Sequence, residues 1–488
     1  MKDFSFRTEE NTTENFTGSL EADKKAVTEL FSDSFDLIAR DIETDGIKLC
    51  AVSLDGMCDE LMITETVIKP VTAHGIKLKK HGVFTQISEE LYKGVSESVC
   101  LSPDEAAEAV TGGNLILLAE GEKRALSFSV QGYPRRAVSE PQTEQNEQGS
   151  RESFTDNFKD NAALLRRRLR TPGLVIEKMT VGQESQTPVL ICYLNGRAER
   201  SLTDRVKERI SATGLDSVMG AGYLRAFLGG NPSPLFAQTG TTERPDVLAA
   251  KLTEGRVGII TDGTPFAIVV PYLFTDHFHT ADDYLSLPAY TVCMRLLRLL
   301  CFITAATLPG LFTAACLFHP GLLPSDIMYD IAAAESRTPF PLMTEAVIIH
   351  LIYETVREAG LRMPAAAGQA VSIVGALVIG DAAVTAGLIG APMLIIVALT
   401  AVCSSVVSKL HESVALLRFG FILAGGLTGF YGIMMLSGVL LVGICSQESF
   451  GVPFTASFSP GALRAKDGFL IKSRKKAGKP TQTGEMKY

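Results

Sequence analysis

One segment separates this chain from ordinary soluble proteins: "MPAAAGQAVSIVGALVIGDAAVTAGLIGAPMLIIVALTAVCSSVVS", Met363–Ser408, whose single charged residue is Asp381. A helix needs about 20 mainly apolar residues to cross the hydrocarbon core of a membrane. The segment is about twice that length, and its glycines and its proline are natural places to divide it. We therefore expect two membrane-spanning helices, near residues 364–382 and 388–408.

Two further apolar runs flank this segment at a distance. Leu299–Phe318 carries no charge, and neither does Phe419–Gln447. These runs predict spans near 299–318 and 419–446, which makes four spans in an all-α transmembrane bundle covering residues 291–447. Within the last span, Gly425 and Gly429 form a GxxxG pair. Such a pair either lets a second helix approach closely or only makes the helix flexible.

The ends of the chain are polar. Residues 1–34 predict a flexible, polar N-terminus without a hydrophobic signal core, and residues 448–488 form a basic tail rich in Lys and Arg. Positive charge beside spans favours the cytoplasmic side. With an even number of spans, both termini are expected in the cytoplasm. This topology places the short link containing Lys409 and Arg418 outside.

The segment between the first two spans carries acidic residues. Leu342–Gly360 has apolar residues at helical spacing, and we expect it to lie on the surface rather than within the bundle. Its Glu345 and Glu354 lie nine positions apart, about 180° around a helix. Asp381 either faces a pore or another subunit, or marks a water-exposed turn between spans two and three. The candidate pore or intersubunit residues are Asp381, Glu345, Glu354, Gly375, Gly425 and Gly429.

The first part of the chain repeats itself. The stretch from Leu49, "LCAVSLDGMCDELMITETVIKPV", is similar to the stretch from Val189, and the stretch from Asn114, "NLILLAEGEKRALSFSV", is similar to the one from Arg256. The two offsets, 140 and 142 residues, are nearly equal. The Asp-Gly, Asn-Gly and Glu-Gly pairs inside these stretches are typical of tight turns. The pattern predicts an α/β soluble head of two duplicated subdomains, residues 35–133 and 172–290.

A charge-segregated connector, residues 134–171, lies between the two subdomains. Its first half is acidic and poor in apolar residues, and its second half predicts an amphipathic helix capped by Thr155 or Asp156 and stopped by Pro172. The arginines of this helix either form a solvated face or contact a neighbouring head, the rest of the head or anionic lipid. These candidate head–head contact residues are Arg166, Arg167, Arg168 and Arg170.

No motif points to catalysis. The chain has neither a Walker A pattern nor GxSxG, and His277 and His279 lack a third ligand nearby. We predict no catalytic, cofactor-binding or metal-binding residue and no cofactor. The nine cysteines are scattered and fit buried thiols. The net charge of −8 argues against a nucleic-acid partner.

Six motifs resemble those of the A subunits of bacterial spore germinant receptors, the GerA family. The motifs read "RRAVSEPQTE", "ALLRRRLRTP", "TERPDVLAAKLTEGRVGIITDGTPFAIVVP", "LPGLFTAACLFHPGLLP", "PFPLMTEAVIIHLIYETVREAGLRMP" and "GQAVSIVGALVIGDAAVTAGLIGAPMLIIVALTAV". The resemblance covers residues 35–465. The resemblance implies a non-enzymatic protein of the spore inner membrane that turns nutrient sensing into ion release and germination. It also implies a transporter-like B subunit, a lipoprotein C subunit and a homo-oligomer whose helices line an ion path.

The chain also departs from the family pattern. It contains no tryptophan, whereas the family has C-terminal tryptophans, and its connector reads "EQNEQGSRESFTDNFKDN", without the apolar pair and the Gly-Pro of the family. These departures leave open a sporulation-operon paralogue with an accessory channel role. A solute transporter is a further alternative, which four spans without a visible inverted repeat support less well.

Overall fold

The computed structural model describes residues 15–458, apart from residues 33, 45, 74–82, 88–95, 133–140, 142–143, 145–148, 230–234 and 364–379. The described residues form two compact units. The head unit contains the residues up to 229 together with Gln238–Tyr272. The helical unit contains residues 235–237 and the chain from Leu273 onward. The segment predicted to span near 364–382 therefore lies largely outside the described residues, as do Gly375 and the basic part of the tail.

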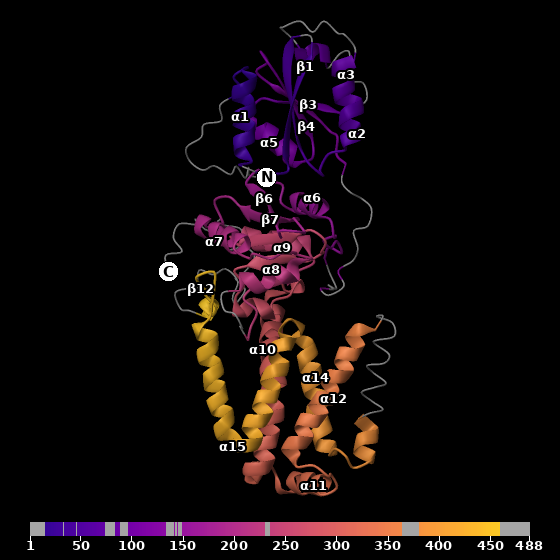
Figure 1. The fold of residues 1–488 in the computed structure, drawn as a ribbon, viewed down its shortest axis with the longest axis vertical. Helices are drawn as coiled ribbons and strands as arrows, with labels where there is room; N and C mark the ends of the chain where they lie inside the picture. The colour runs from indigo at the N-terminus through magenta and orange to yellow at the C-terminus, as the bar shows by residue number, and fades with distance from the viewer. Residues whose placement is uncertain are drawn as a thin grey trace. The chain divides into compact units, whose positions relative to one another are not determined.

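The first subdomain of the head unit is a five-stranded antiparallel sheet with helices on both faces (Figure 1). Its strands, in sheet order, are β1 (Leu37–Thr44), β2 (Ile47–Leu54), β4 (Leu115–Ala119), β5 (Ala125–Phe128) and β3 (Glu97–Cys100). Its helical segments are α1 (Leu20–Leu30), α2 (Glu60–Met62), η1 (Ile63–Ile68), α3 (Lys69–Ala73), α4 (Val83–Gln86) and α5 (Pro103–Thr111). Alternate strand residues face two separate cores: Leu49 and Leu117 pack toward η1, and Cys50 and Ile116 pack toward α1 and α5. This alternation follows from the two-residue period of a strand.

The second subdomain has the same connectivity. Its strands, in sheet order, are β6 (Leu174–Val181), β7 (Thr187–Leu194), β9 (Val257–Thr261), β10 (Ala267–Val270) and β8 (Gly240–Thr242). Its helices are α6 (Phe158–Arg168), α7 (Arg200–Ser211), α8 (Ala221–Leu228) and α9 (Pro245–Thr253). The orders β1-β2-β4-β5-β3 and β6-β7-β9-β10-β8 are equivalent position by position. The prediction of a duplicated α/β head is therefore confirmed.

The repeated turns have one backbone conformation. Gly56 follows β2 at φ 74°, and Gly196 follows β7 at φ 74°. In the two hairpins, β4–β5 and β9–β10, Gly121 and Gly263 have φ 87° and 78°. Only glycine enters this left-handed region without steric cost. The Asp-Gly, Asn-Gly and Glu-Gly pairs seen in the sequence thus mark the same turns in both copies.

The N-terminal segment and the connector differ from the sequence expectations. Residues 1–34 were expected to be flexible, but α1 packs on the first sheet through Leu20, Val27 and the neighbouring Phe31. The polar composition of this segment belongs to the outer face of an amphipathic helix. In the connector, α6 is capped by Asn157, whose side chain accepts a hydrogen bond from Lys159 N at 2.9 Å, rather than by Thr155 or Asp156.

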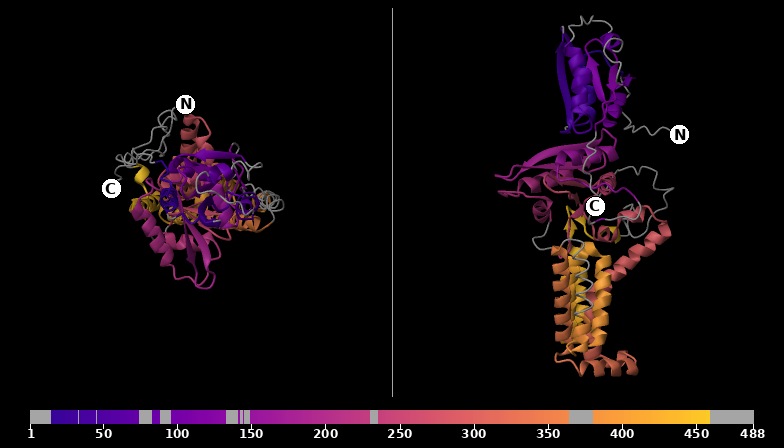
Figure 2. Two further views of the ribbon diagram at one scale, coloured as in Figure 1. Left: turned by 90° about the horizontal axis from the view of Figure 1, so that it is seen from above. Right: turned by 90° about the vertical axis from the view of Figure 1, so that its right-hand side faces the viewer.

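The helical unit consists of long helices that run side by side, with α11 across one end (Figures 1 and 2). Its helical elements are η3 (Phe274–Phe278), η4 (Ala281–Tyr284), α10 (Pro288–Phe318), η5 (Pro320–Leu322), α11 (Ser325–Glu335), α12 (Leu342–Arg362), α14 (Ala391–Val406), η6 (Ser408–Leu410), α15 (His411–Ser446) and η7 (Ala456–Phe458). A short hairpin of β11 (Glu448–Ser449) and β12 (Val452–Pro453) follows α15. In the described part of the chain, Pro288–Phe318 and Ser408–Ser446 are long and apolar enough to cross a membrane.

Three expectations about the helical unit and about where it begins differ from the structure. The expected span near 419–446 lies in α15, which Gly429 divides at φ 65° into two helical segments (Figure 1). The link containing Arg418, expected outside the membrane, is part of the first of these segments. The second subdomain, expected to extend to residue 290, ends at Tyr272.

An aromatic cluster ties distant parts of the helical unit together. Phe274 lies 5.6 Å from Phe236, 5.9 Å from Phe454 and 6.1 Å from Phe302, measured between ring centroids. The N–H of Phe274 also donates to the carbonyl of Phe454 at 3.1 Å. The segment after α15 is thereby packed against η3 and α10, and at least the first residues of the predicted tail are part of the folded unit.

Candidate functional site

The candidate site is a set of buried charges carried by α12. This helix packs against α10, α14 and α15, and its Glu345 and His350 are completely buried. It was expected on the surface, with its acids Glu345 and Glu354 on opposite faces of the helix. Within the helical unit these acids instead have protein partners.

Glu354 is the centre of a network that joins three helices. Its Oε1 lies 3.2 Å from Nη1 of Arg418, and its Oε2 lies 3.2 Å from Nε2 of His411 and 3.5 Å from Nη1 of Arg357. Arg418 is fully buried, and its Nε donates to the carbonyl of Ala305 in α10 at 3.1 Å. Buried charges are retained only when they are paired and hydrogen-bonded. This network therefore fixes the contacts of α12, α15 and α10.

Glu345 has a separate environment on the other side of α12. Its Oε1 accepts a hydrogen bond at 2.8 Å from the N–H of Gly390, the residue that caps α14. The N-terminus of a helix carries partial positive charge and favours a carboxylate. Glu345 thus connects the start of α12 with the start of α14. Glu354 and Glu345 do not share one cluster, which agrees with their calculated positions on opposite faces of the helix.

The two glycines of the GxxxG pair have different roles. A Cβ on Gly425 would lie 2.3 Å from the carbonyl oxygen of Gly310, and a Cβ on Gly310 would lie 2.3 Å from the carbonyl oxygen of Phe421. The backbones of α10 and α15 therefore touch at this level, as expected for small residues between packed helices. Gly429 instead supplies the left-handed turn in α15, next to the Phe318 ring.

The remaining candidates of the helical unit are not part of this network. Asp381 is exposed, in a helical turn that ends shortly before α14. Gly375 lies outside the described residues. Of the six candidate pore or intersubunit residues, Glu345, Gly425 and Gly429 are buried at contacts between helices, and Glu354 is partly buried at such a contact.

The arginines of α6 separate into buried and partly exposed groups. Arg166 is fully buried, and its Nε and Nη2 lie 2.8 and 2.9 Å from the carboxylate of Asp36. Its Nη2 also donates to Oγ of Ser34 at 2.7 Å, and this hydroxyl accepts from the N–H of Ile176 at 3.0 Å. Arg166 therefore joins the first subdomain to β6 of the second.

The other arginines of α6 are nearer to solvent. Arg167 and Arg168 both pair with Glu152, and Arg170 is exposed. A contact of these three with a neighbouring head stays a prediction. The contacts that the structure gives for Arg166, Arg167 and Arg168 are internal to the head.

The comparisons with known proteins concern nearly the whole chain. Residues 25–481 match the family described as "Bacillus/Clostridium GerA spore germination protein". This chain belongs to the GerA family. The similarity includes both the duplicated head and the helical unit.

Relatives of this GerA-family chain include several germination proteins. It is 35% identical to spore germination protein KA of Bacillus subtilis (strain 168), over 88% of this chain and 79% of the relative. It is also 35% identical to the uncharacterized membrane protein YfkQ of the same organism, over 83% and 81%. Spore germination protein GerLA of Bacillus cereus is 30% identical, over 87% of each chain.

The GerA-family chain is also similar to a solved structure. It is the N-terminal domain of the A subunit of the Bacillus megaterium spore germinant receptor GerK3, with 24% identity and a TM-score of 0.43. The similarity covers 54% of this chain and 99% of that domain.

Several site residues of this GerA-family chain were not found from its sequence. Arg418 was assigned to a link outside the membrane, and Asp36 was not among the candidates. Asp283 was also missed: Nε of Arg295 lies 3.1 Å from its Oδ2, and Nη1 of Arg298 lies 2.9 Å from the same oxygen. For Arg295 and Arg418, the sequence did contain a signal: each is an arginine among the apolar residues of a long helix. Such an arginine requires a buried acid as its partner.

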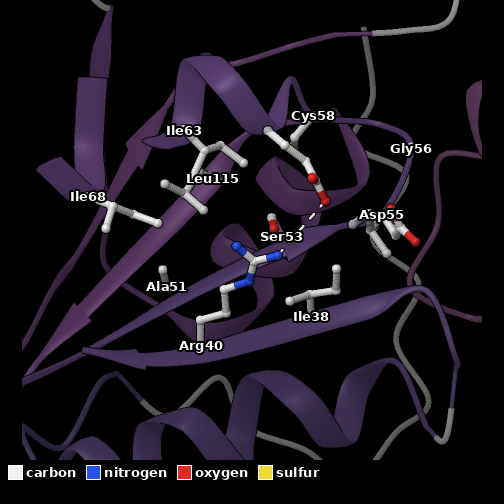
Figure 3. A pocket seen from close by; sticks show the side chains of 12 residues that line it. Ile38, Arg40, Ala51, Ser53, Asp55, Gly56, Cys58, Ile63, Ile68 and Leu115 are labelled. Atoms are coloured by element: carbon white, nitrogen blue, oxygen red, sulfur yellow. Dashed lines mark ion pairs between the residues drawn. The ribbon is translucent and has the colours of Figure 1, made fainter. Parts of the chain in front are cut away.

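The structure adds no sign of a catalytic centre in the described residues of this GerA-family chain. They contain no group of three or more His, Cys, Asp or Glu side chains that could hold a metal ion. The cavity in Figure 3 lies in the first subdomain, next to an ion pair of 3.8 Å between Arg40 and Glu60. Its volume of about 20 Å³ is near that of a single water molecule. A metabolite would not fit there.

Proposed function

We propose that this chain is the membrane subunit of a spore germinant receptor, where it passes a nutrient signal through its helical unit to ion release. The observation that carries the proposal is the buried Glu354–Arg418 network, because it couples three helices of an apolar unit that follows a duplicated head. Membership of the GerA family and the names of the relatives support a role in germination.

In this proposal the receptor contains several kinds of subunit. A transporter-like B subunit senses the nutrient, a lipoprotein C subunit is associated, and this chain forms a homo-oligomer whose helices line an ion path. The receptor lies in the spore inner membrane, with the head and both termini of this chain in the cytoplasm. The candidate residues for the ion path or for contacts between subunits are Asp381, Glu345, Glu354, Gly375, Gly425 and Gly429.

The test measures cation release from spores that are exposed to a nutrient mixture. Deletion of the gene is expected to reduce release, and the Asp381→Asn variant is expected to do the same at normal protein level. Asp381 is exposed, so this substitution should leave folding intact. The control is Glu358→Gln, because Glu358 is an exposed acid of α12 that pairs with Arg362. Normal release by the deletion strain would reject the receptor role, and normal release by Asp381→Asn alone would reject only its part in the ion path.

A second candidate is a GerA-family paralogue of a sporulation operon that acts as an accessory germination channel. The absence of tryptophan and the altered connector favour it. The neighbouring reading frames distinguish the two: genes for a transporter-like protein and a lipoprotein support the receptor, and a sporulation operon supports the paralogue.

A further inference from the structure

The helix α8 of the head unit is apolar on both of its faces. Its inner face, with Leu224 and Leu228, is buried. On its outer face Tyr223 and Phe227 lie four positions apart, so they share one side of the helix, and they are 53% and 42% exposed. Met219, just before the helix, is 68% exposed. A helix on a soluble surface turns polar residues outward, so this outer face requires an apolar partner.

Arginines lie beside the outer face of α8. Arg225 is the only charged residue of the helix, and it forms no ion pair with a described residue. At the end of α8, Nη1 of Arg209 from α7 donates to the carbonyl of Leu228 at 2.7 Å. Burial, and then the charge of Arg205, lower the pKa of Arg209, and the charge of Glu208 opposes them. Exposed apolar side chains flanked by arginines are typical of a surface that binds anionic lipid.

The chain joins α8 closely to helices that are long and apolar enough to cross a membrane. Leu235 follows Gly229 by six positions and already belongs to the helical unit. A connection of this length reaches at most about 22 Å. Within the helical unit, Phe236 lies 6.0 Å from Phe302 of α10 between ring centroids, and Oγ of Ser413 in α15 donates to the carbonyl of Leu235. The bilayer that these helices cross is therefore an apolar partner within reach of α8.

We propose that the outer face of α8 binds the surface of the membrane that the helical unit crosses, with Tyr223 and Phe227 at the edge of the hydrocarbon and Arg225 at anionic headgroups. A tyrosine suits this place because its ring is apolar and its hydroxyl is polar. An arginine suits it because its stem covers apolar surface while its charge reaches the headgroups. The contact attaches the head to the bilayer at a second place besides the chain itself. It goes beyond the proposed function, because it requires a bilayer but no germination signal.

The test places a photoreactive side chain on this face of the full-length chain. Tyr223 is replaced by p-benzoylphenylalanine, which forms a covalent bond to a neighbouring C–H group on illumination. The chain is reconstituted in nanodiscs of phosphatidylglycerol and phosphatidylcholine, and mass spectrometry of the digested chain identifies what is attached. We expect lipid adducts at position 223. The control carries the same side chain in place of Leu61, an apolar residue of the first subdomain that is 75% exposed, and should yield none.

A second comparison tests the charge. The yield of lipid adduct at position 223 should fall when the nanodiscs contain phosphatidylcholine alone, and it should fall in the same way when Arg225→Gln is added in mixed nanodiscs. An unchanged yield in both cases would overturn the binding of anionic headgroups by Arg225.

Three outcomes overturn the membrane contact itself. They are the absence of lipid adducts at position 223, equal yields at positions 223 and 61, and a cross-link from position 223 to protein. A cross-linked dimer on a denaturing gel would show that a second copy of the chain covers α8. Both replaced residues are exposed, so the variants should fold, and a thermal melt recorded by circular dichroism verifies this. Neither nutrient nor ion flux is used, so a failure here is separate from a failure of the receptor proposal.

Discussion

Arg166 is a single residue on which the joining of the two subdomains depends. Replacing it by Met leaves the buried Asp36 without its guanidinium partner. Breaking a buried pair from one side costs about 3–5 kcal/mol, so we expect Arg166→Met to destabilise the head by this amount. Hydrogen exchange of the β1 and β6 amides in the detergent-solubilised chain measures the effect.

Two variants control this prediction. Arg168→Met removes a partly exposed arginine of the same helix, and exposed pairs contribute only about 0.2–1 kcal/mol. The double variant Arg166→Met with Asp36→Leu should recover stability, because it removes both buried charges. Equal exchange rates in Arg166→Met and Arg168→Met would contradict the assigned role.

The cysteines provide a second prediction for single residues. Burial, and then a hydrogen bond to Asp41, raises the pKa of Cys50 to about 12, and burial raises the pKa of Cys58 to about 11. Only the thiolate reacts with a maleimide, so both should remain unmodified in the folded chain at neutral pH and react after unfolding. Mass spectrometry of the labelled peptides tests this, with the exposed Cys293 as the reactive reference. Rapid labelling of Cys50 in the folded chain would show that β2 is not buried as described.

At the scale of elements, the contact between α10 and α15 depends on glycine. Gly425→Ala places a methyl group against the backbone of Gly310, where a Cβ would be 2.3 Å from a carbonyl oxygen. The two helices must then separate, and packing changes of this kind cost about 1–3 kcal/mol. We expect a lower melting temperature of the purified chain in detergent.

The same helix offers a matched control. A Cβ on Gly438 meets no atom within 4 Å, and an Ala there is favoured over Gly by about 0.5–1 kcal/mol in a helix interior. Gly438→Ala should therefore melt at the same or a higher temperature. If Gly425→Ala melts like Gly438→Ala, the close contact of α10 and α15 does not form in the protein.

For the whole molecule, the apolar helices predict integral membrane behaviour. The surfaces of α14 and α15 expose many large apolar side chains, including Ile395, Val402, Leu427, Met434 and Val442. Exposed apolar patches of this extent are unfavourable in water. We expect the full-length chain to remain with membranes during washes at high salt and alkaline pH and to require detergent for extraction. Recovery of folded chain in the soluble fraction would contradict this prediction.

Patterns that repeat along the chain were predictable from the sequence. The offsets of 140 and 142 residues identified the duplicated head, because equal turns and apolar strands recur at equal spacing in both copies. The long apolar runs identified α10, α14 and α15, because the length and the hydrophobicity of a helix are local properties of the sequence. The motifs also pointed to the GerA family, which the comparison confirmed.

The partners of individual charges were decided only by the tertiary structure. Arg166 contacts Asp36 across 130 positions of the chain, and Arg418 contacts Glu354 across 64. Composition makes such residues look exposed, because a charge is stable in water by itself but stable in a core only beside its partner. That partner comes from another element, and no local pattern encodes the distance between them. The sequence by itself therefore determined the elements and their repetition, while the fold determined which charges are buried and what each one holds together.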